Sequence, residues 1–352
     1  AALRLATDAG KQVTAHQDIH LRAENATGGS ILTGGLAAGR DIAVYSPTAS
    51  IKLGSALAGD DIVLRALNGM IEVTGDLKAG RDLPGMTPTD AVGAADDLNT
   101  ALPFQDFDGN PATIFSVVGF DVSLSSQSIN VGGSTVAGRE PSTDSPDTPG
   151  PVDATTSDVR IQTRLTMTPV LNLAPNIVLG SVTATRDLQI DSAKAITTGD
   201  LIAGRDIAVL GRGGVTPGAT PGDHSGSGVT LASARAGDDA LAFSIYGRTR
   251  ILGGVTSGLL FQRLVPTNNR VIDGATEAAD QLAIYLRYFD LDDASAPYVL
   301  KGGVIHIVGQ GIDVGGNLSA QGVDSDIRVR SGLDIVVTGD TAAAGYAVFQ
   351  TD

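Results

Sequence analysis

Aspartate is the residue type in this sequence whose spacing could support chemistry. The aspartates at 41, 61 and 206 each follow a glycine by two positions, and uninterrupted neighbours in the series lie 19 to 23 residues apart. A column of carboxylates could bind calcium or carbohydrate, or it could accept hydrogen bonds from backbone N–H groups at a turn. We expect the second, structural role. The full set of corner residues is Gly39, Asp41, Gly59, Asp61, Gly80, Asp82, Gly204, Asp206, Gly237 and Asp239.

Elsewhere in the chain, the sequence offers few residue patterns that could bind a metal ion or supply a nucleophile. Residues 106–110 and 290–293 offer alternating oxygen ligands, but neither continues to the glutamate that completes an EF-hand loop. On an extended strand, His16 and His20 would lie about 13 Å apart, too far for one zinc ion. The absence of cysteine excludes disulfides and thiolate sites. We therefore expect no catalytic residue and no cofactor, and calcium is the one metal that stays open.

Aromatic side chains are scarce, and three of them lie close together. Tyr285, Tyr288 and Phe289 belong to residues 277–291, where Leu282 and its apolar neighbours have helical spacing, although the run also fits an alternating strand. Exposed tyrosines here would form a binding patch for sugar or protein. Packed tyrosines would fix the segment against the core, which is the role we expect. The three aromatics are the candidate binding surface of the chain.

Composition excludes several classes of protein. The chain has 352 residues with 45 glycines, 8 phenylalanines, 6 tyrosines and no tryptophan, and its hydrophobic share is 42%. Small and branched aliphatic side chains supply most of that share, which suits a long, thin core. A net charge of −15 argues against nucleic acid and anionic membrane as partners. No apolar run is long enough to span a bilayer as a helix.

Internal repeats decide the fold prediction. Residues 34–54 and 55–75 follow one plan, and further copies open at 76–83 and 199–210. In each copy, apolar residues alternate with variable ones up to the glycine, which is the pattern of a strand with one buried face. We expect the glycine to turn the corner with a positive φ. The two inward columns are Leu36, Ala56, Leu77, Leu201 and Ala234, then Ala38, Ala58, Ala79, Ala203 and Ala236.

Three short strands and three corners in about 20 residues describe one coil of a solenoid. We therefore predict an all-β chain, a right-handed parallel β-helix, that forms a single β-helix segment over residues 1–352. Neither end has the features of a natural terminus, so we expect it to be part of a larger polypeptide. The predicted insertions, one of which could contain a helix, are residues 84–115, 140–158, 211–228 and 257–300.

The repeat resembles that of filamentous haemagglutinin-like exoproteins of the two-partner secretion pathway. The match lies in residues 34–75, 75–83 and 199–210, and the sequence Ala-Gly-Arg-Asp-Ile recurs at 38–42 and 203–207. The resemblance implies a right-handed β-helix that a barrel transporter exports across a Gram-negative outer membrane. It also implies a secreted or cell-surface location, and a role in adhesion, biofilm formation or display of a distal toxin.

Two classes of function remain to be compared. The first is a non-enzymatic segment of a surface fibre that contacts a glycan or protein on a host or bacterial cell, with the shaft of a contact-dependent toxin as a variant. The second is a polysaccharide lyase or hydrolase, because parallel β-helices also carry such enzymes. An enzyme would need paired acids in one groove, whereas aspartate recurs here at one corner of many coils. We therefore expect the non-enzymatic class.

Overall fold

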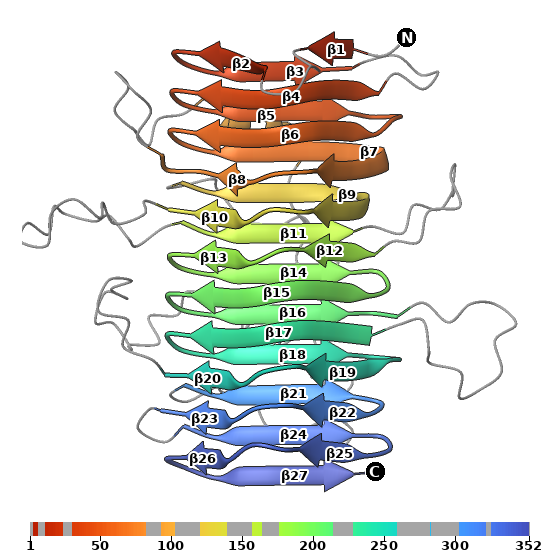
Figure 1. Ribbon diagram of the computed structural model, residues 1–352, viewed down its shortest axis with the longest axis vertical. Coiled ribbons are helices and arrows are strands. Elements are labelled where there is room, and N and C mark those ends of the chain that lie inside the picture. The colour runs from red at the N-terminus through yellow and green to blue at the C-terminus, as the bar shows by residue number, and fades with distance from the viewer. Residues whose placement is uncertain are drawn as a thin grey trace, which may run out of the picture. The chain divides into compact units, whose positions relative to one another are not determined.

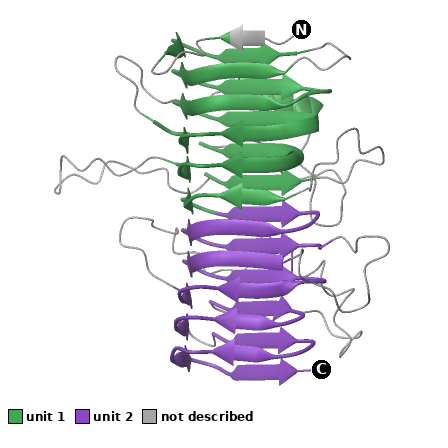
Figure 2. Ribbon diagram, turned by 45° about the vertical axis from the view of Figure 1, so that its right-hand side comes forward, with its two compact units in different colours: residues 1–104, 111–186 green, residues 105–110, 187–352 purple. Residues whose placement is uncertain are grey.

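The computed structural model divides the chain into two compact units. Unit 1 comprises residues 1–104 and 111–186, and unit 2 comprises residues 105–110 and 187–352 (Figure 2). No helix among the described residues is long and apolar enough to cross a membrane. The described residues are 3–5, 11–23, 30–81, 93–102, 120–138, 157–163, 176–213, 228–258, 282, 303–321 and 325–351.

Unit 1 is built from short parallel strands that stack coil upon coil (Figure 1). Each coil contributes to three faces, which we name A, B and C in the order in which the chain follows them after the corner aspartate. The strands are β1 (Leu3–Leu5), β2 (Gln12–Ala15), β3 (Ile19–Arg22), β4 (Ile31–Ala38), β5 (Ile42–Ser46), β6 (Ile51–Ala58), β7 (Ile62–Val73), β8 (Leu77–Lys78), β9 (Val122–Val131), β10 (Thr135–Ala137), β11 (Val159–Thr163), β12 (Ile177–Leu179) and β13 (Val182–Ala184).

Unit 2 repeats the same plan. Face A is formed by β14, β16, β18, β21, β24 and β27, whose neighbours along the stack pair as parallel strands. The strands are β14 (Leu188–Ser192), β15 (Ile196–Ala203), β16 (Ile207–Gly211), β17 (Gly228–Ala236), β18 (Ala240–Ser244), β19 (Arg248–Ile251), β20 (Val255–Ser257), β21 (Ile305–Gly309), β22 (Ile312–Val314), β23 (Leu318–Ala320), β24 (Ile327–Ser331), β25 (Ile335–Val337), β26 (Thr341–Ala343) and β27 (Ala347–Thr351). The predicted all-β parallel β-helix is confirmed.

Equivalent side chains lie above one another, as the repeat predicts. On face C of unit 1, Leu36 pairs with Ala56 and Ala56 pairs with Leu77. In unit 2, Leu201 pairs with Ala234. All five side chains are buried. The columns follow from the period of two along each strand, because every second residue points inward and the register keeps inward positions aligned.

The interior is aliphatic. Burying a side chain of this kind contributes roughly 1.5–3 kcal/mol, but a single coil cannot cover its own apolar side, so stability is shared along the stack. Phe243 is the one aromatic residue in the buried apolar set of the described residues. It lies on the outer side of β18, where it packs with Leu210, Leu241 and Leu282.

One helix covers the outer side of face A in unit 1. Helix α1 (Ala94–Ala101) packs against Ala43 of β5 and Val63 of β7. It forms because apolar residues at 95, 98 and 102 recur at helical spacing, and because Asp96 Oδ2 accepts the backbone N–H of Gly93 at 2.7 Å. The sequence prediction had treated residues 84–115 as an insertion without a helix. Residues 277–291, where a helix was expected, lie outside the described residues except for Leu282, which is helical.

Arg65 fixes α1 to the coils. Its guanidinium is buried on the outer side of β7 and donates to Asn99 Oδ1 at 3.0 Å and to the carbonyl oxygen of Ser123 at 2.9 Å. A further bond, at 3.3 Å, reaches the carbonyl oxygen of Leu102 at the end of the helix. The helix is therefore an integral part of unit 1 and not a loosely attached insert.

The narrow alanine column gives the first prediction. Ala58 is fully buried and pairs with Ala38 of the preceding coil. We expect Ala58→Leu to lower the free energy of unfolding by roughly 1–3 kcal/mol, because the extra volume overpacks the interior. Urea unfolding monitored by circular dichroism measures the change. Leu57→Met, at the adjacent outward position, is the control and should change stability by less than about 0.5 kcal/mol. Equal effects of the two changes would contradict the inward column.

Candidate functional site

The corner between faces C and A is the candidate site, because the recurring glycine and aspartate both lie there. We name it the Gly-Asp corner, defined by Gly39-Arg40-Asp41 and the equivalent residues of other coils. Of the predicted corner glycines, Gly80 has the expected positive φ, whereas Gly39, Gly59, Gly204 and Gly237 do not. They are required by close approach instead. A Cβ atom on Gly59 would lie 2.1 Å from the carbonyl oxygen of Gly39, and one on Gly237 would lie 1.8 Å from that of Gly204.

Positive φ is found at four glycines of the described residues. Gly80, Gly138, Gly213 and Gly258 have φ values of 74°, 99°, 56° and 69°. Each one lies at or just before the point where the repeat is interrupted, and three of the four occupy the corner position itself. The left-handed conformation, which glycine adopts without steric strain, therefore marks the exits from the coil and not the regular turns.

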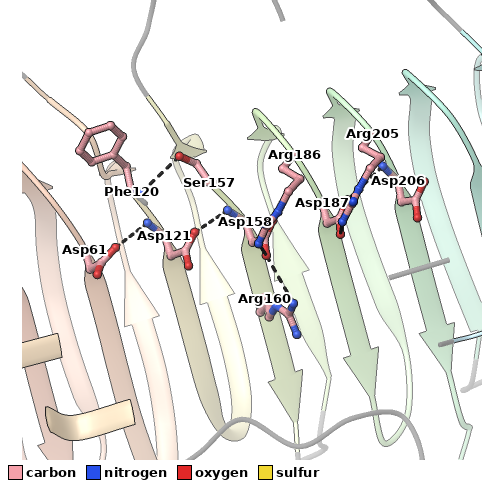
Figure 3. A network of polar contacts seen from close by, with 10 residues as sticks. All are labelled: Asp61, Phe120, Asp121, Ser157, Asp158, Arg160, Arg186, Asp187, Arg205 and Asp206. Carbon is pink, nitrogen blue, oxygen red and sulfur yellow. Dashed lines mark hydrogen bonds and ion pairs between the residues drawn. The ribbon is translucent and has the colours of Figure 1, made fainter. Parts of the chain in front are cut away.

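The aspartates form a ladder along unit 1. Asp41 Oδ1 accepts the backbone N–H of Asp61 at 3.5 Å, Asp61 Oδ1 accepts that of Asp121 at 2.6 Å, and Asp121 Oδ1 accepts that of Asp158 at 2.5 Å. Asp18 Oδ1 accepts the N–H of Asp41 in the same way at 3.4 Å. Figure 3 shows the part of this ladder from Asp61 to Asp158. Each carboxylate thus satisfies a backbone donor of the next coil.

Unit 2 contains an equivalent ladder. Asp187 Oδ1 accepts the N–H of Asp206 at 3.4 Å, and Asp206 Oδ1 accepts that of Asp239 at 3.3 Å. Asp239 Oδ1 in turn accepts the N–H of Val304 at 2.6 Å. The same bond recurs in the last coils, where Asp326 Oδ1 accepts the N–H of Tyr346 at 2.9 Å. A ladder position can hold Val or Tyr as well, because only the preceding coil supplies the acceptor.

Sequence spacing misplaced two members of the ladder. Asp121, and not the predicted Asp82, occupies the position after Asp61, and Asp158 occupies the position next to Asp121. Asp82, and Glu140, at which spacing places the corner of a weaker copy of the repeat, both lie outside the described residues. The missed signal was an aspartate followed by alternating apolar residues, Asp-Val-Ser-Leu at 121–124 and Asp-Val-Arg-Ile at 158–161. Counting from the glycine failed because the chain leaves the coil between the corner glycine and the ladder position.

Arginine supplies the positive charge at several rungs. The guanidinium of Arg40 binds both oxygen atoms of Asp18 at 2.6 Å, and that of Arg205 binds the carboxylate of Asp187, with Nε at 2.7 Å from Oδ1. In each case the arginine precedes the next aspartate of the ladder and reaches back by one coil. Bidentate pairs of this kind are the strong, geometrically specific form of the interaction.

The carboxyl groups differ in pKa according to these surroundings. The Arg40 guanidinium holds the pKa of Asp18 below its usual value. Burial raises the pKa of Asp41 to about 6, although the N–H groups of Ala95 and Asp61 oppose the shift. Burial, reinforced by neighbouring carboxylates, raises the pKa of Asp61 and of Asp121 well above the ordinary range.

Three carboxyl groups lie close together at one place in the described residues. Oxygen atoms of Asp41, Asp60 and Asp61 all lie within 4.8 Å of one another. The three side chains are 0–2% exposed, and Asp41 and Asp61 already accept backbone N–H groups. This arrangement is suited to holding the corner together, since it leaves no open face toward a substrate. Residues 106–110 and 290–293 lie outside the described residues.

Of the segment that contains the candidate aromatic surface, the structure describes Leu282. Tyr285, Tyr288 and Phe289 lie outside the described residues. Leu282, from the same segment, is fully buried against Leu210, Leu241 and Phe243 on the outer side of face A. This contact fixes at least one point of the segment to the side of unit 2.

The histidines do not form a metal site among the described residues. His16 and His20 are exposed, at the end of β2 and in β3. His306 in β21 packs edge-to-face on Phe243 with ring centroids 4.8 Å apart. Desolvation, together with the charges of Arg328 and Arg330, lowers the pKa of His306 to about 3, so the ring is neutral at physiological pH and serves packing.

Comparison with known proteins leaves the chain without an assigned relative: no family model, no curated protein and no solved structure matches it.

Close approach at the Gly-Asp corner gives the second prediction. We expect Gly237→Ala to destabilise unit 2 by at least roughly 1–3 kcal/mol, because the new methyl group meets the carbonyl oxygen of Gly204 and the coils must separate. Thermal unfolding measures the loss. The control is Gly35→Ala, where the nearest atom to the added Cβ is the flexible Gln12 Cγ at 3.1 Å. If Gly237→Ala is as stable as the parent chain, the backbones of the two coils are farther apart at this corner than in the structure.

The buried arginine–aspartate pair gives the third prediction. Arg205→Ala leaves the carboxylate of Asp187, whose side chain is 4% exposed, without its guanidinium. We expect a loss of roughly 3 kcal/mol in the free energy of unfolding, since removing one partner strands a buried charge. Arg235→Ala, at an exposed position of β17, is the control and should cost less than about 1 kcal/mol, because the interactions of an exposed charge contribute little. Equal losses from both changes would argue against the pairing.

Proposed function

We propose that this chain is a non-enzymatic structural and adhesive segment of a large bacterial surface fibre, of the filamentous haemagglutinin-like class. In this proposal it is exported by two-partner secretion through an outer-membrane barrel transporter and acts at the surface of a Gram-negative cell or as a secreted protein. The resemblance of the repeat and the parallel β-helix fold support the proposal together. The shaft of a contact-dependent toxin is a variant of the same function.

The observation that carries the proposal is the structural role of the aspartates that recur in the repeat. The described ladder carboxylates accept backbone N–H groups of the next coil, as in the bond from Asp121 to Asp61. Residues that could have formed a reactive groove are therefore committed to stacking. Several of the predicted insertions follow left-handed glycines, and insertions of this kind let a scaffold present different surfaces without disturbing its core.

A lyase or hydrolase is the less favoured reading. Glycoside hydrolysis needs two carboxyl groups that flank a bound sugar. The described cluster of Asp41, Asp60 and Asp61 is buried to 2% exposure or less, which leaves no access for a polysaccharide. We therefore propose no cofactor and no catalytic residue.

The ligand in this proposal is a glycan or protein on a host or bacterial cell. The candidate surface is formed by Tyr285, Tyr288 and Phe289, and Leu282, just before them in the sequence, packs on unit 2. Tyrosine rings pair an apolar face with a hydroxyl group, which suits sugar and protein recognition. The three aromatics can be substituted while Leu282 and its contact with unit 2 are kept.

The fourth prediction tests this binding role. We expect the purified chain to bind to a glycan array or to whole cells, and the triple variant Tyr285→Ala, Tyr288→Ala and Phe289→Ala to lose at least about tenfold in affinity, or about 1.4 kcal/mol. Tyr246→Ala, which removes a tyrosine that is 43% exposed on unit 2, is the matched control and should bind like the parent chain.

Two results would count against the proposal. Full binding by the triple variant would move recognition to another surface. Depolymerisation of an acidic polysaccharide by the parent chain, abolished by Asp60→Asn, would replace the adhesive function with an enzymatic one.

A further inference from the structure

The ladder of unit 1 is not uniformly paired with arginine. Asp18 is held by Arg40, and Asp158 is held by Arg186, with Nε at 2.7 Å from Oδ1, and by Arg160 at 3.3 Å. Between these ends lie Asp41, Asp61 and Asp121, which form no ion pair among the described residues. All three are buried to 2% exposure or less. We name this run the arginine-free rungs.

A residue other than arginine precedes the next aspartate at each of these three rungs. At a paired rung, the residue that precedes the next aspartate of the ladder is the arginine that reaches back. After Asp41 that residue is Asp60, which adds a negative charge. After Asp61 and Asp121 it is Phe120 and Ser157, the residues at which the chain rejoins the coil. At the two departures from the corner, a residue other than arginine therefore precedes the next aspartate of the ladder.

Other charged groups around these rungs are mostly negative. Asp41 faces the carboxylates of Asp18 and Asp96, and one of its oxygen atoms lies within 4.8 Å of an oxygen atom of Asp60 and one of Asp61. The positive groups nearby are Arg40, which is bound to Asp18, and Arg81, which follows the corner residue Gly80. Asp121 interacts with the carboxylates of Asp61 and Asp158, while Arg160 and Arg186 oppose them from the Asp158 side.

Hydrogen bonding also differs among the three carboxyl groups. Asp41 accepts two backbone N–H groups, from Asp61 through Oδ1 and from Ala95 of α1 through Oδ2 at 2.9 Å. Asp121 accepts one through Oδ1, and its buried Oδ2 has no hydrogen-bond partner among the described residues. A bound proton is the smallest species that neutralises such a buried carboxylate.

We propose that the arginine-free rungs take up protons on folding, so that the stability of unit 1 depends on pH. The coils around β5, β7 and β9 are most stable in mild acid and become less stable as the pH rises. The helix α1 is not the moving part, because an ionised Asp41 binds the N–H of Ala95 more strongly than a protonated one. The change lies in the stacking of the coils, where neighbouring carboxylates repel each other once they ionise.

The sign follows from linkage. A carboxyl group whose pKa is raised on folding stabilises the fold fully below its unfolded value, near 4, and this stabilisation is lost as the pH rises through the folded value. For Asp41 the loss runs from near 4 to about 6. For Asp61 and Asp121, with pKa values raised well above the ordinary range, it extends to higher pH.

Hydrogen exchange on the whole chain tests the proposal. Protection factors, corrected for the intrinsic pH dependence of exchange, are compared at pH 5 and pH 8 for peptides from β5, β7 and β9. We expect the parent chain to lose at least about tenfold in protection at pH 8, since one pKa unit corresponds to a factor of ten. Asp61→Asn keeps an oxygen acceptor for the N–H of Asp121, so it should be neutral at pH 5 and restore about tenfold protection at pH 8. Asp121→Asn is the second variant if the first does not fold.

The matched control variant should change protection at pH 8 in the opposite direction. Asp18→Asn leaves Arg40 without its carboxylate, so it should lower protection at pH 8 and not raise it. Parent protection that is equal at pH 5 and pH 8 would overturn the proposal, as would an Asp61→Asn variant that behaves like Asp18→Asn. A calcium titration at pH 8 completes the test. No effect of calcium is expected, and a gain matching that of Asp61→Asn would show that the rungs hold a cation instead of protons.

Discussion

Direct stacking of one coil on the next, at the strand spacing of about 4.8 Å, is the constraint from which the other features follow. It brings equivalent residues into vertical contact, so every position in the repeat must be compatible with a copy of itself. Inward positions become columns of Ile, Leu, Val and Ala. The corner glycine cannot carry a Cβ atom, because the carbonyl oxygen of the coil before it occupies that space. The ladder aspartate places its carboxylate where the next N–H group arrives.

The same constraint brings the negative charges of neighbouring coils close together. Stacked aspartates at this spacing repel each other strongly when buried. A guanidinium that reaches back by one coil relieves the repulsion, as Arg205 does for Asp187. Where another residue takes the place of that arginine, this relief is absent, and carboxyl groups such as Asp61 have raised pKa values. The residue that precedes each aspartate thus affects the electrostatics of the core.

Sequence predicted the fold well because the period is carried by many residues at once. The columns headed by Leu36 and Leu201 lie as the alternation requires, since a strand with one buried face has little freedom of register. Local features were harder to predict. Helix α1 is short, and its apolar residues lie in a segment dominated by Pro, Asp and Gly. Asp121 and Asp158 escaped notice because counting from the glycine assumes an unbroken corner. The role of Arg65 could not be predicted, because its partners Asn99 and Ser123 lie near it only in the folded chain.

Distances between spin labels in one column test the stacking most directly, because the chain has no cysteine and labels attach only where cysteine is introduced. Thr197 and Thr230 are register partners on outward positions of β15 and β17, although 33 residues separate them. Labels at Thr197→Cys and Thr230→Cys should show strong dipolar broadening, as expected for strands about 5 Å apart. Labels at Thr197→Cys and Arg235→Cys, which lie on different faces, should broaden far less. Absence of broadening in the first pair would show that the coils do not stack in this register.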